Sequence, residues 1–121
     1  PPCHCLFQFY LYEKYLSLHM YQRSADMFLG VPYNITSYCL LLSIISKITN
    51  LIPLEFIHSI GDAHIYVDHV SQVREQLFRT SHTLPTLEIT SSHKSINDFK
   101  MSDFVLHDYV YHPSIKAHMS V

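Results

Sequence analysis

The sequence predicts a single α+β domain, in which a mixed β-sheet packs against helices. Hydrophobic residues make up 48% of its 121 residues and charged residues 15%, which provides enough apolar surface for a folded core. Segments with the two-residue period of strands lie beside segments with helical spacing, without the strict alternation of βαβ proteins. No repeat, low-complexity tract or linker interrupts the sequence, so we expect one domain over residues 1–121.

Two aromatic-rich segments near the start predict a pair of strands. Residues 5–12 and 15–22 carry the aromatic and aliphatic side chains that are typical of strands. Glu13 and Lys14 stand between the two segments and predict a turn. We therefore expect a β-hairpin at this end of the chain.

A long helix is expected to follow the hairpin. Residues 24–31 predict a connection, and Pro32 suits the first turn of a helix over residues 33–49. Apolar side chains at helical spacing extend nearly all round this helix, which predicts that it is buried. Asn50 and Pro53 are expected to end it.

The second half of the chain has weaker patterns. Residues 55–60 predict a strand, and Asp68 is a suitable N-cap for a helix over residues 69–79. Residues 86–90 predict a further strand, and residues 98–111 mix short strand signals with acidic residues. The segments between them, 80–85 and 91–97, are expected to be loops.

Charge and hydropathy exclude some classes of function. The formal net charge is −2 with ten neutral histidines and no basic run, so we expect no general nucleic-acid binding. The most apolar stretch, residues 38–45, is closed by Lys47 and falls short of the roughly 20 residues that a membrane span needs. No secretory leader pattern opens the sequence, so we expect neither membrane insertion nor secretion.

The cysteines predict free thiols. There are three of them, Cys3, Cys5 and Cys39, and the odd number favours a reducing compartment. Cys3 and Cys5 would point to the same face of a strand, a geometry that disfavours a disulfide. We expect a cytoplasmic protein, or a nuclear or mitochondrial one if its source is eukaryotic.

The segment from residue 22 to residue 34 gathers side chains that can hold a nucleotide. Arg23 and Ser24 can bind a phosphate through a forked guanidinium and a hydroxyl. Asn34 offers an acceptor and two donors, which match the acceptor and donor edge of a uracil ring. Asp26 can accept a hydrogen bond from a second heterocycle. Taken singly, each of these residues is also an ordinary turn, cap or surface residue.

Cys3 is the candidate nucleophile. The reactive form of a cysteine is the thiolate, which a nearby cation favours, and Arg23 on the second strand of the hairpin could supply that cation. Gly30 would allow the backbone to approach a flat ligand closely. On its own, a cysteine at the start of a strand is more often a buried structural residue.

Four motifs along the chain resemble the thymidylate synthase family. They read PPCHCLFQFY at residues 1–10, QRSADMFLGVPYN at 22–34, GDAHIYVDH at 61–69 and YVYHPSIKAHMSV at 109–121. Subunits of that family are longer than 121 residues. The resemblance therefore implies the C-terminal catalytic portion of the family's domain, with the N-terminal half absent from residues 1–121.

The resemblance implies a methyltransferase that converts dUMP to dTMP by reductive methylation. Cys3 would attack C6 of the uracil, and 5,10-methylenetetrahydrofolate would be the co-substrate, donating both the one-carbon unit and a hydride. The resemblance implies a homodimer, and the residue spacing leads us to expect no metal. The nearest histidine and carboxylate cluster, at residues 64–69, does not match a zinc template.

The resemblance also assigns ligand-binding positions. For dUMP these are Gln22, Arg23, Ser24, Ala25, Asp26, Asn34, His64, Ile65 and Tyr66. For the folate they are Asp26, Leu29, Gly30, Tyr33 and Ser120, where the C-terminal residues would close over the bound folate. His4 and Asp62 would lie behind the ligand-contacting side chains, in a network of water.

The chain departs from the family pattern at several positions. Asp68 replaces an asparagine, Tyr111 a proline, Asp108 a glycine and Ser120 an alanine, and residues 80–83 replace an EPRP-like loop. Because the family's upstream catalytic residues are also missing, we expect the 121-residue chain alone to be weakly active or inactive. Two further hypotheses stay open. One is a non-catalytic remnant or interaction module, and the other is a pyrimidine hydroxymethylase, which Asn34 disfavours.

Overall fold

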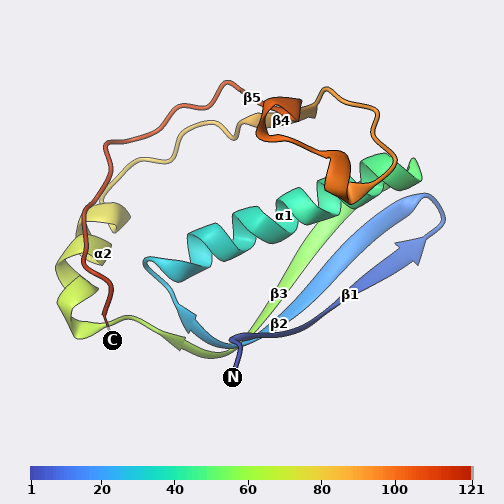
Figure 1. The fold of residues 1–121 in the computed structure, drawn as a ribbon. Helices are drawn as coiled ribbons and strands as arrows, with labels where there is room; N and C mark the ends of the chain where they lie inside the picture. The colour runs from blue at the N-terminus through green and yellow to red at the C-terminus, as the bar shows by residue number, and fades with distance from the viewer. Residues whose placement is uncertain (121) are drawn as a thin grey trace.

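A twisted three-stranded sheet and a long helix lying across it form the first half of the molecule (Figure 1). In this computed structural model, which describes residues 1–120, the sheet has the order β1-β2-β3. β1 (His4–Tyr12) pairs antiparallel with β2 (Tyr15–Asp26), and β2 pairs parallel with β3 (Ile52–His64). Since parallel neighbours need a crossover, the chain passes from β2 to β3 through α1 (Gly30–Thr49).

The core lies between the sheet and α1. Leu16 and Leu18 of β2 and Leu42 of α1 form its centre, and Phe9 and Phe56 pack against them from the neighbouring strands. Side chains of a strand alternate between its two faces, so every second residue of β2 faces the helix. The mixed sheet packed with helices confirms the predicted α+β class.

The turns have the conformations that their residues favour. Glu13 has a φ of 53° in the two-residue turn of the hairpin, and Tyr12 pairs directly with Tyr15. Asn50 ends α1 in a left-handed conformation, at φ 56° and ψ 36°, which asparagine tolerates better than most residues. The turn at Glu13 and the helix end at Asn50 were both predicted from the sequence.

The second half of the chain forms an arm of short elements that arches over the first half (Figure 1). A 3₁₀ turn, η1 (Val67–His69), leads into α2 (Val70–Leu77), and the short strands β4 (Thr86–Ile89) and β5 (Phe104–His107) pair antiparallel. Two further 3₁₀ turns, η2 (Ile96–Asp98) and η3 (Met101–Asp103), lie between those strands. In the described part of the arm, residues 65–120, the sheet formed by β4 and β5 has only two strands.

Several predicted boundaries were wrong. β2 continues to Asp26 and α1 begins at Gly30, so most of the expected connection over residues 24–31 belongs to these two elements. The strand expected over residues 55–60 extends over the whole of β3, because parallel pairing with β2 continues on both sides of it.

The predicted role of Asp68 as a helix N-cap was also wrong. Asp68 lies within η1, His69 is the residue that precedes α2, and the helix ends at Leu77 rather than at residue 79. The Asp68 carboxylate instead accepts a hydrogen bond from Ser120, 52 residues away. Asp68 therefore bonds to the distant Ser120 instead of to the backbone of the helix that follows it.

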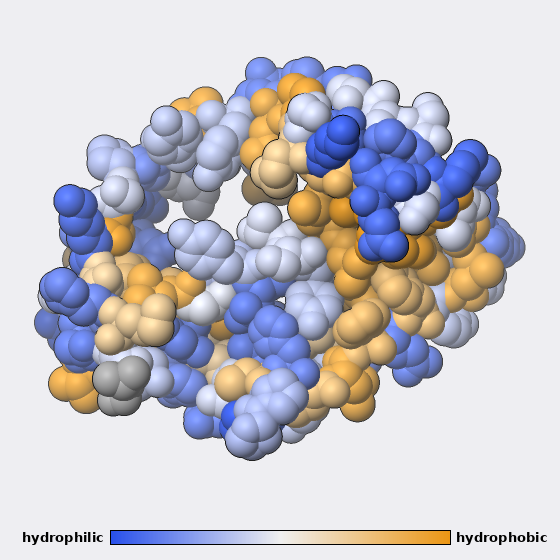
Figure 2. All heavy atoms as spheres, viewed as in Figure 1, coloured by the Kyte–Doolittle hydropathy of each residue, from blue (hydrophilic) through white to orange (hydrophobic). Residues whose placement is uncertain are grey.

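The expectation that α1 is buried nearly all round holds only in its second half. Its buried residues include Leu42 and Ile44, whereas Tyr33 and Ile35 in the first two turns are exposed. The side of the sheet opposite α1 also exposes large apolar groups, among them Leu6, Tyr10, Tyr12 and Ile57. Figure 2 shows apolar side chains gathering toward the β1 side of the molecule. Among residues 1–120, no helix has the length and apolar character to cross a membrane.

Candidate active site

One end of the sheet brings together residues from four separate segments of the chain. β1 begins there with His4, β2 ends there with Asp26, and β3 ends there with His64, while α1 starts nearby (Figure 1). The strand register pairs His4 with Gln22 and Asp26 with His64. The sequence-predicted residues near positions 3, 22–34 and 62–66 therefore converge, although up to 63 positions separate them in the sequence.

The candidate nucleophile Cys3 contacts Arg23. The guanidinium Nη2 of Arg23 donates to the Cys3 sulfur at 3.6 Å, and the backbone N–H of Arg23 donates to the Cys3 carbonyl at 2.9 Å. Cys3 is exposed and is a free thiol, so a ligand can reach its sulfur. The predicted pairing of this thiol with the Arg23 cation is thus present in the structure.

The same guanidinium also ties down the start of the chain. Its Nε donates to the Pro2 carbonyl at 3.0 Å, and Nη2 donates to the Pro1 carbonyl at 2.8 Å. Within residues 1–120, Nη1 makes no hydrogen bond to a protein group. Arg23 therefore orients the segment that carries Cys3 and keeps one donor nitrogen for another acceptor.

Gln22 and Asn34 form a second polar cluster close to Cys3. The Gln22 side chain is 3% exposed, and its amide Nε2 donates to Asn34 Oδ1 at 3.1 Å and to the Ser24 carbonyl at 2.9 Å. His58 Nε2 lies 2.9 Å from the remaining Gln22 oxygen, Oε1. The Asn34 amide is thereby linked to β2 and β3 as well as to its own helix.

Asp26 organises the turn between β2 and α1. Its Oδ1 accepts hydrogen bonds from the backbone N–H groups of Phe28 and Leu29, at 3.0 and 3.3 Å. Such an Asx turn uses one carboxylate oxygen and leaves the other for a ligand. A Cβ added to Gly30 would meet only ordinary contacts, at 3.5 Å or more, and φ there is not positive. Packing within the chain therefore does not explain why residue 30 is a glycine.

His64 and Tyr66 lie together at the end of β3. Their rings meet edge to face, with 5.2 Å between centroids, although β3 ends at His64 and Tyr66 lies two residues beyond the strand on which both were expected. His64 Nδ1 is buried and makes no hydrogen bond within the described chain, and the Asp62 carboxylate lies 3.6 Å from it. A buried polar atom without a hydrogen-bond partner is unusual in a folded protein.

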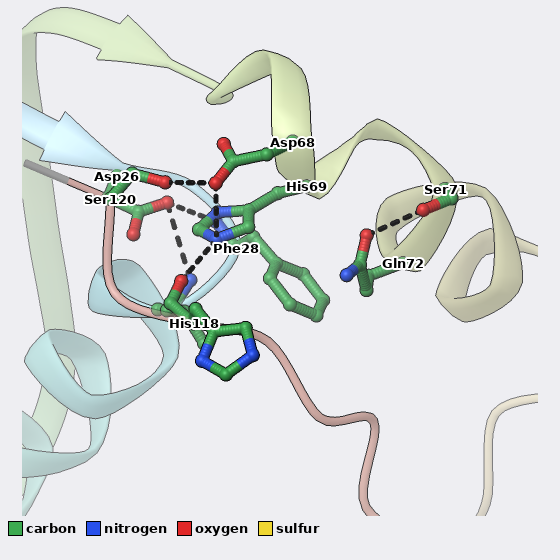
Figure 3. A network of polar contacts seen from close by, with 9 residues as sticks. Asp26, Phe28, Asp68, His69, Ser71, Gln72, His118 and Ser120 are labelled. Atoms are coloured by element: carbon green, nitrogen blue, oxygen red, sulfur yellow. Dashed lines mark hydrogen bonds and ion pairs between the residues drawn. The ribbon is translucent and has the colours of Figure 1, made fainter.

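The C-terminal tail is held against η1 (Figure 3). The Ser120 hydroxyl donates to Asp68 at 2.6 Å, and the buried His69 donates from Nε2 to the His118 carbonyl at 2.7 Å. The hydrogen bond from Ser120 is the main reason that the pKa of Asp68 is lowered. Asp68 and Ser120 are two of the positions where the resemblance implied a departure from the family pattern, and the structure joins them by this hydrogen bond.

A hollow of about 450 Å³ opens beside this site. It lies where the start of α1 faces the end of α2 and the tail, and its lining includes Leu29, Tyr33, Arg79 and His112. Figure 2 shows an opening between the arm and the centre of the molecule. The hollow contains two of the residues assigned to the folate, Leu29 and Tyr33, and neither Cys3 nor Asn34.

Three of the predicted positions need separate comment. Ala25 is 1% exposed, so only its backbone remains for contact with a ligand, whereas Ile65 is exposed. His4 lies behind the cluster, where its Nδ1 is 3.3 Å from the Tyr38 hydroxyl. The roles assigned to the site residues stay predictions.

Sequence reasoning missed His58. This histidine shares one face of β3 with Asp62 and His64, and the two-residue period of the strand was the signal that could have found it. The strand was expected to begin at residue 55 and to end at residue 60, so the common face was not apparent. In the described part of the chain, no cluster of three histidine, cysteine or acidic side chains could hold a metal ion.

An exposed thiol beside a guanidinium and two hydrogen-bonded carboxamides lie at one end of the mixed sheet, an arrangement that suits nucleophilic chemistry. The sequence model for thymidylate synthase matches residues 1–121. The chain belongs to the thymidylate synthase family.

Similar proteins include two viral and one bacterial thymidylate synthase. The chain is 55% identical to the protein of Saimiriine herpesvirus 2 (strain 11), 54% to that of Herpesvirus ateles and 53% to that of Mycoplasma mobile. Each match covers the whole of this chain. The chain spans only 41% or 42% of the length of these relatives.

Proposed function

We propose that this protein is a thymidylate synthase that methylates dUMP reductively to dTMP, with 5,10-methylenetetrahydrofolate as the co-substrate. The observation that carries the proposal is the 3.6 Å contact between the Cys3 sulfur and Arg23, at the sheet end where Asn34 also lies. Membership of the family, with identities of 53–55% to named enzymes, supports it.

In this proposal Cys3 acts as a covalent catalyst. Its sulfur forms a bond to C6 of the uracil, and the electron pair of the C5–C6 double bond makes C5 the nucleophile. The folate would supply the one-carbon unit and the hydride that together become the methyl group; the bond between that carbon and the folate nitrogen would break, and the folate would leave oxidised as dihydrofolate. C5 loses its proton, and breaking the bond between C6 and the Cys3 sulfur restores the ring and the free thiol.

The rest of the nucleotide would be held by residues near Cys3. Arg23, through Nη1, and Ser24 would bind the phosphate, and Asn34 would read the uracil edge. His64 and Tyr66 would bind the 3′-hydroxyl of the deoxyribose, and the unsatisfied His64 Nδ1 supports a polar partner there. Gln22 would position Asn34, to which it is already bonded.

The folate would lie against the start of α1. The free Asp26 oxygen would accept from the pterin, and Leu29 and Tyr33 would flank its ring beside the open hollow. At Gly30 the chain itself leaves space for a Cβ, which supports close approach of a flat ligand as the reason for the glycine. Ser120 would hold the tail over this site from its contact with Asp68.

We further propose that the protein acts as a homodimer. The sheet face opposite α1 exposes Leu6, Tyr10, Tyr12 and Ile57, an apolar surface that is unfavourable in water. A second copy of the chain would cover it. The isolated 121-residue chain should be weakly active or inactive, because the family's proton-handling and folate-stacking residues lie outside the portion that it matches.

The test is covalent trapping with 5-fluoro-dUMP and 5,10-methylenetetrahydrofolate. The fluorine at C5 cannot leave as a proton does, so a working site should retain both ligands on the protein. We expect an adduct in the intact mass spectrum of the protein expressed at the full length that its gene encodes. The adduct should vanish in Cys3→Ser and persist in Cys5→Ser, a matched control at an exposed thiol two residues away.

The trapping experiment also separates the rival functions. A folded protein that forms no adduct would contradict the proposal and favour a non-catalytic member of the family. An adduct that survives in Cys3→Ser would assign the nucleophile to another thiol. A preference for dCMP over dUMP would favour a hydroxymethylase, against the identity of Asn34.

A further inference from the structure

His58 begins a series of hydrogen bonds that runs through Gln22 to the side-chain amide of Asn34, the residue proposed to read the base. The ring Nε2 of His58 lies 2.9 Å from Gln22 Oε1, and Gln22 Nε2 lies 3.1 Å from Asn34 Oδ1. Gln22 is almost fully buried, so it cannot exchange these partners for bulk water. The three side chains come from β3, β2 and α1 and meet at the candidate site.

A backbone carbonyl fixes the direction of every bond in this chain. The Ser24 carbonyl, 2.9 Å from Gln22, can only accept, so the amide group facing it must be the Gln22 nitrogen. The Gln22 oxygen therefore faces His58, which must carry a proton on Nε2. The second proton of the Gln22 nitrogen points to Asn34, whose side-chain oxygen must accept it.

The surroundings of His58 favour a neutral ring with that single proton. Burial, together with the nearby ring of His4, lowers the pKa of His58. The Phe56 ring lies 5.5 Å from the His58 ring and restricts its movement. The donor to Gln22 is thus a positioned Nε2–H group rather than a freely rotating cation.

This directed chain has a consequence for base recognition. An asparagine can read uracil, with its oxygen on N3–H and its nitrogen on O4, or cytosine after its amide turns over by 180°. Turning the Asn34 amide would place its N–H groups against the N–H group of Gln22. The two donors would then be left without an acceptor, a costly arrangement in a buried site.

We propose that His58 is a positioning residue that locks the Asn34 amide, through Gln22, in the orientation that selects uracil over cytosine. The proposal rests on the proposed function, because it assumes that Asn34 reads a pyrimidine. Without the Nε2–H donor, the Gln22 oxygen loses its partner and only the Ser24 carbonyl still holds the Gln22 amide, so the amide turns over more readily and Asn34 can turn with it. His58 need not touch the nucleotide to have this effect.

The test compares dUMP and dCMP binding by calorimetry in the protein expressed at the full length that its gene encodes. In His58→Phe, which keeps an aromatic ring and removes the donor, the preference for dUMP should fall about five- to tenfold. His58→Gln supplies an amide donor and should restore most of the preference. His107 in β5 is hydrogen-bonded to Glu88 in β4, away from the candidate site. His107→Phe should therefore leave the preference for dUMP unchanged.

Two results would overturn the proposal while leaving the proposed function intact. The first is an unchanged dUMP preference in a folded His58→Phe protein, when Asn34→Asp shifts the preference toward dCMP in the same assay. The second needs no variant. Nitrogen NMR of the unaltered protein should find the His58 proton on Nε2, and a proton on Nδ1 alone would contradict the hydrogen bond that His58 donates to Gln22. If the unaltered protein does not bind dUMP, the proposed function fails, and this inference fails with it.

Discussion

The sheet and α1, residues 4–64, and the arm, residues 65–120, are held in place by different forces. The first region has a continuous core around Leu16, Leu18 and Leu42. In the arm, α2 has no buried residue, and β4 and β5 have four residues each. Burial of apolar area stabilises the first region, whereas the second depends on individual polar contacts.

The contacts that hold the arm are side chains bonded to distant backbone carbonyls. Arg79 donates to the Pro113 carbonyl, His112 to the Thr80 carbonyl, and His69 to the His118 carbonyl. Each bond joins residues more than 30 positions apart and contributes about 1 kcal/mol. The arm should therefore open locally before the sheet unfolds.

The largest expected effect is a cavity in the core of the first region. Leu18 is fully buried, and Leu18→Ala should lower the free energy of unfolding by about 2–5 kcal/mol. Leu106 in β5 is 53% exposed, and Leu106→Ala should cost less than about 0.5 kcal/mol. Urea unfolding of both variants measures the difference, and equal losses would contradict the contrast between the two regions.

The next effect concerns the close approach of β2 and β3. A Cβ on Gly61 would lie 2.9 Å from the Arg23 carbonyl oxygen and 2.9 Å from the Tyr21 hydroxyl. The hydroxyl can move but the strand backbone cannot, so Gly61→Ala should destabilise the protein by about 1–3 kcal/mol. Gly30→Ala is the matched control, since its Cβ would meet nothing closer than 3.5 Å. A melting temperature equal for both variants would refute this reading of Gly61.

A smaller and more local effect is expected from His69. His69→Phe keeps a ring next to Phe28 and removes the donor to the His118 carbonyl, at a cost of about 1 kcal/mol. Backbone amides of residues 116–120 should exchange faster with deuterium, while those of β2 keep their protection. Faster exchange across the whole sheet would show that the arm and the sheet unfold together.

The smallest effect is expected at the exposed bond between Asp68 and Ser120. The Ser120 hydroxyl lowers the pKa of Asp68 below its ordinary value of 3.8, so the contact stabilises the tail above that pH. Its contribution is lost as the pH falls through the lowered pKa, where the carboxylate gains a proton. In Ser120→Ala the pKa of Asp68, followed by carbon NMR, should rise. Ser114→Ala should leave it unchanged, and no rise in Ser120→Ala would contradict the role of this bond.

The periodic elements of the first region were predictable from the sequence. The hairpin with Glu13 at its turn and the helix that ends at Asn50 follow from local rules of periodicity and turn conformation. The proximity of Cys3 and Arg23 followed from the hairpin, because antiparallel pairing carries the second strand back past the start of the first. The hairpin, the helix end and the proximity of Cys3 to Arg23 all follow from residues that are near one another in the sequence.

The remaining features depend on contacts between residues far apart in the sequence. The pairing of β3 with β2 extended a strand whose flanks look irregular in sequence, and it brought His58 within 2.9 Å of Gln22. Asp68 has the residue type of a helix cap, yet it bonds to Ser120 because the arm folds back over η1. The sequence determined which residues can donate, accept or pack. Partners far apart along the chain depend on how the whole chain closes, which no local pattern encodes.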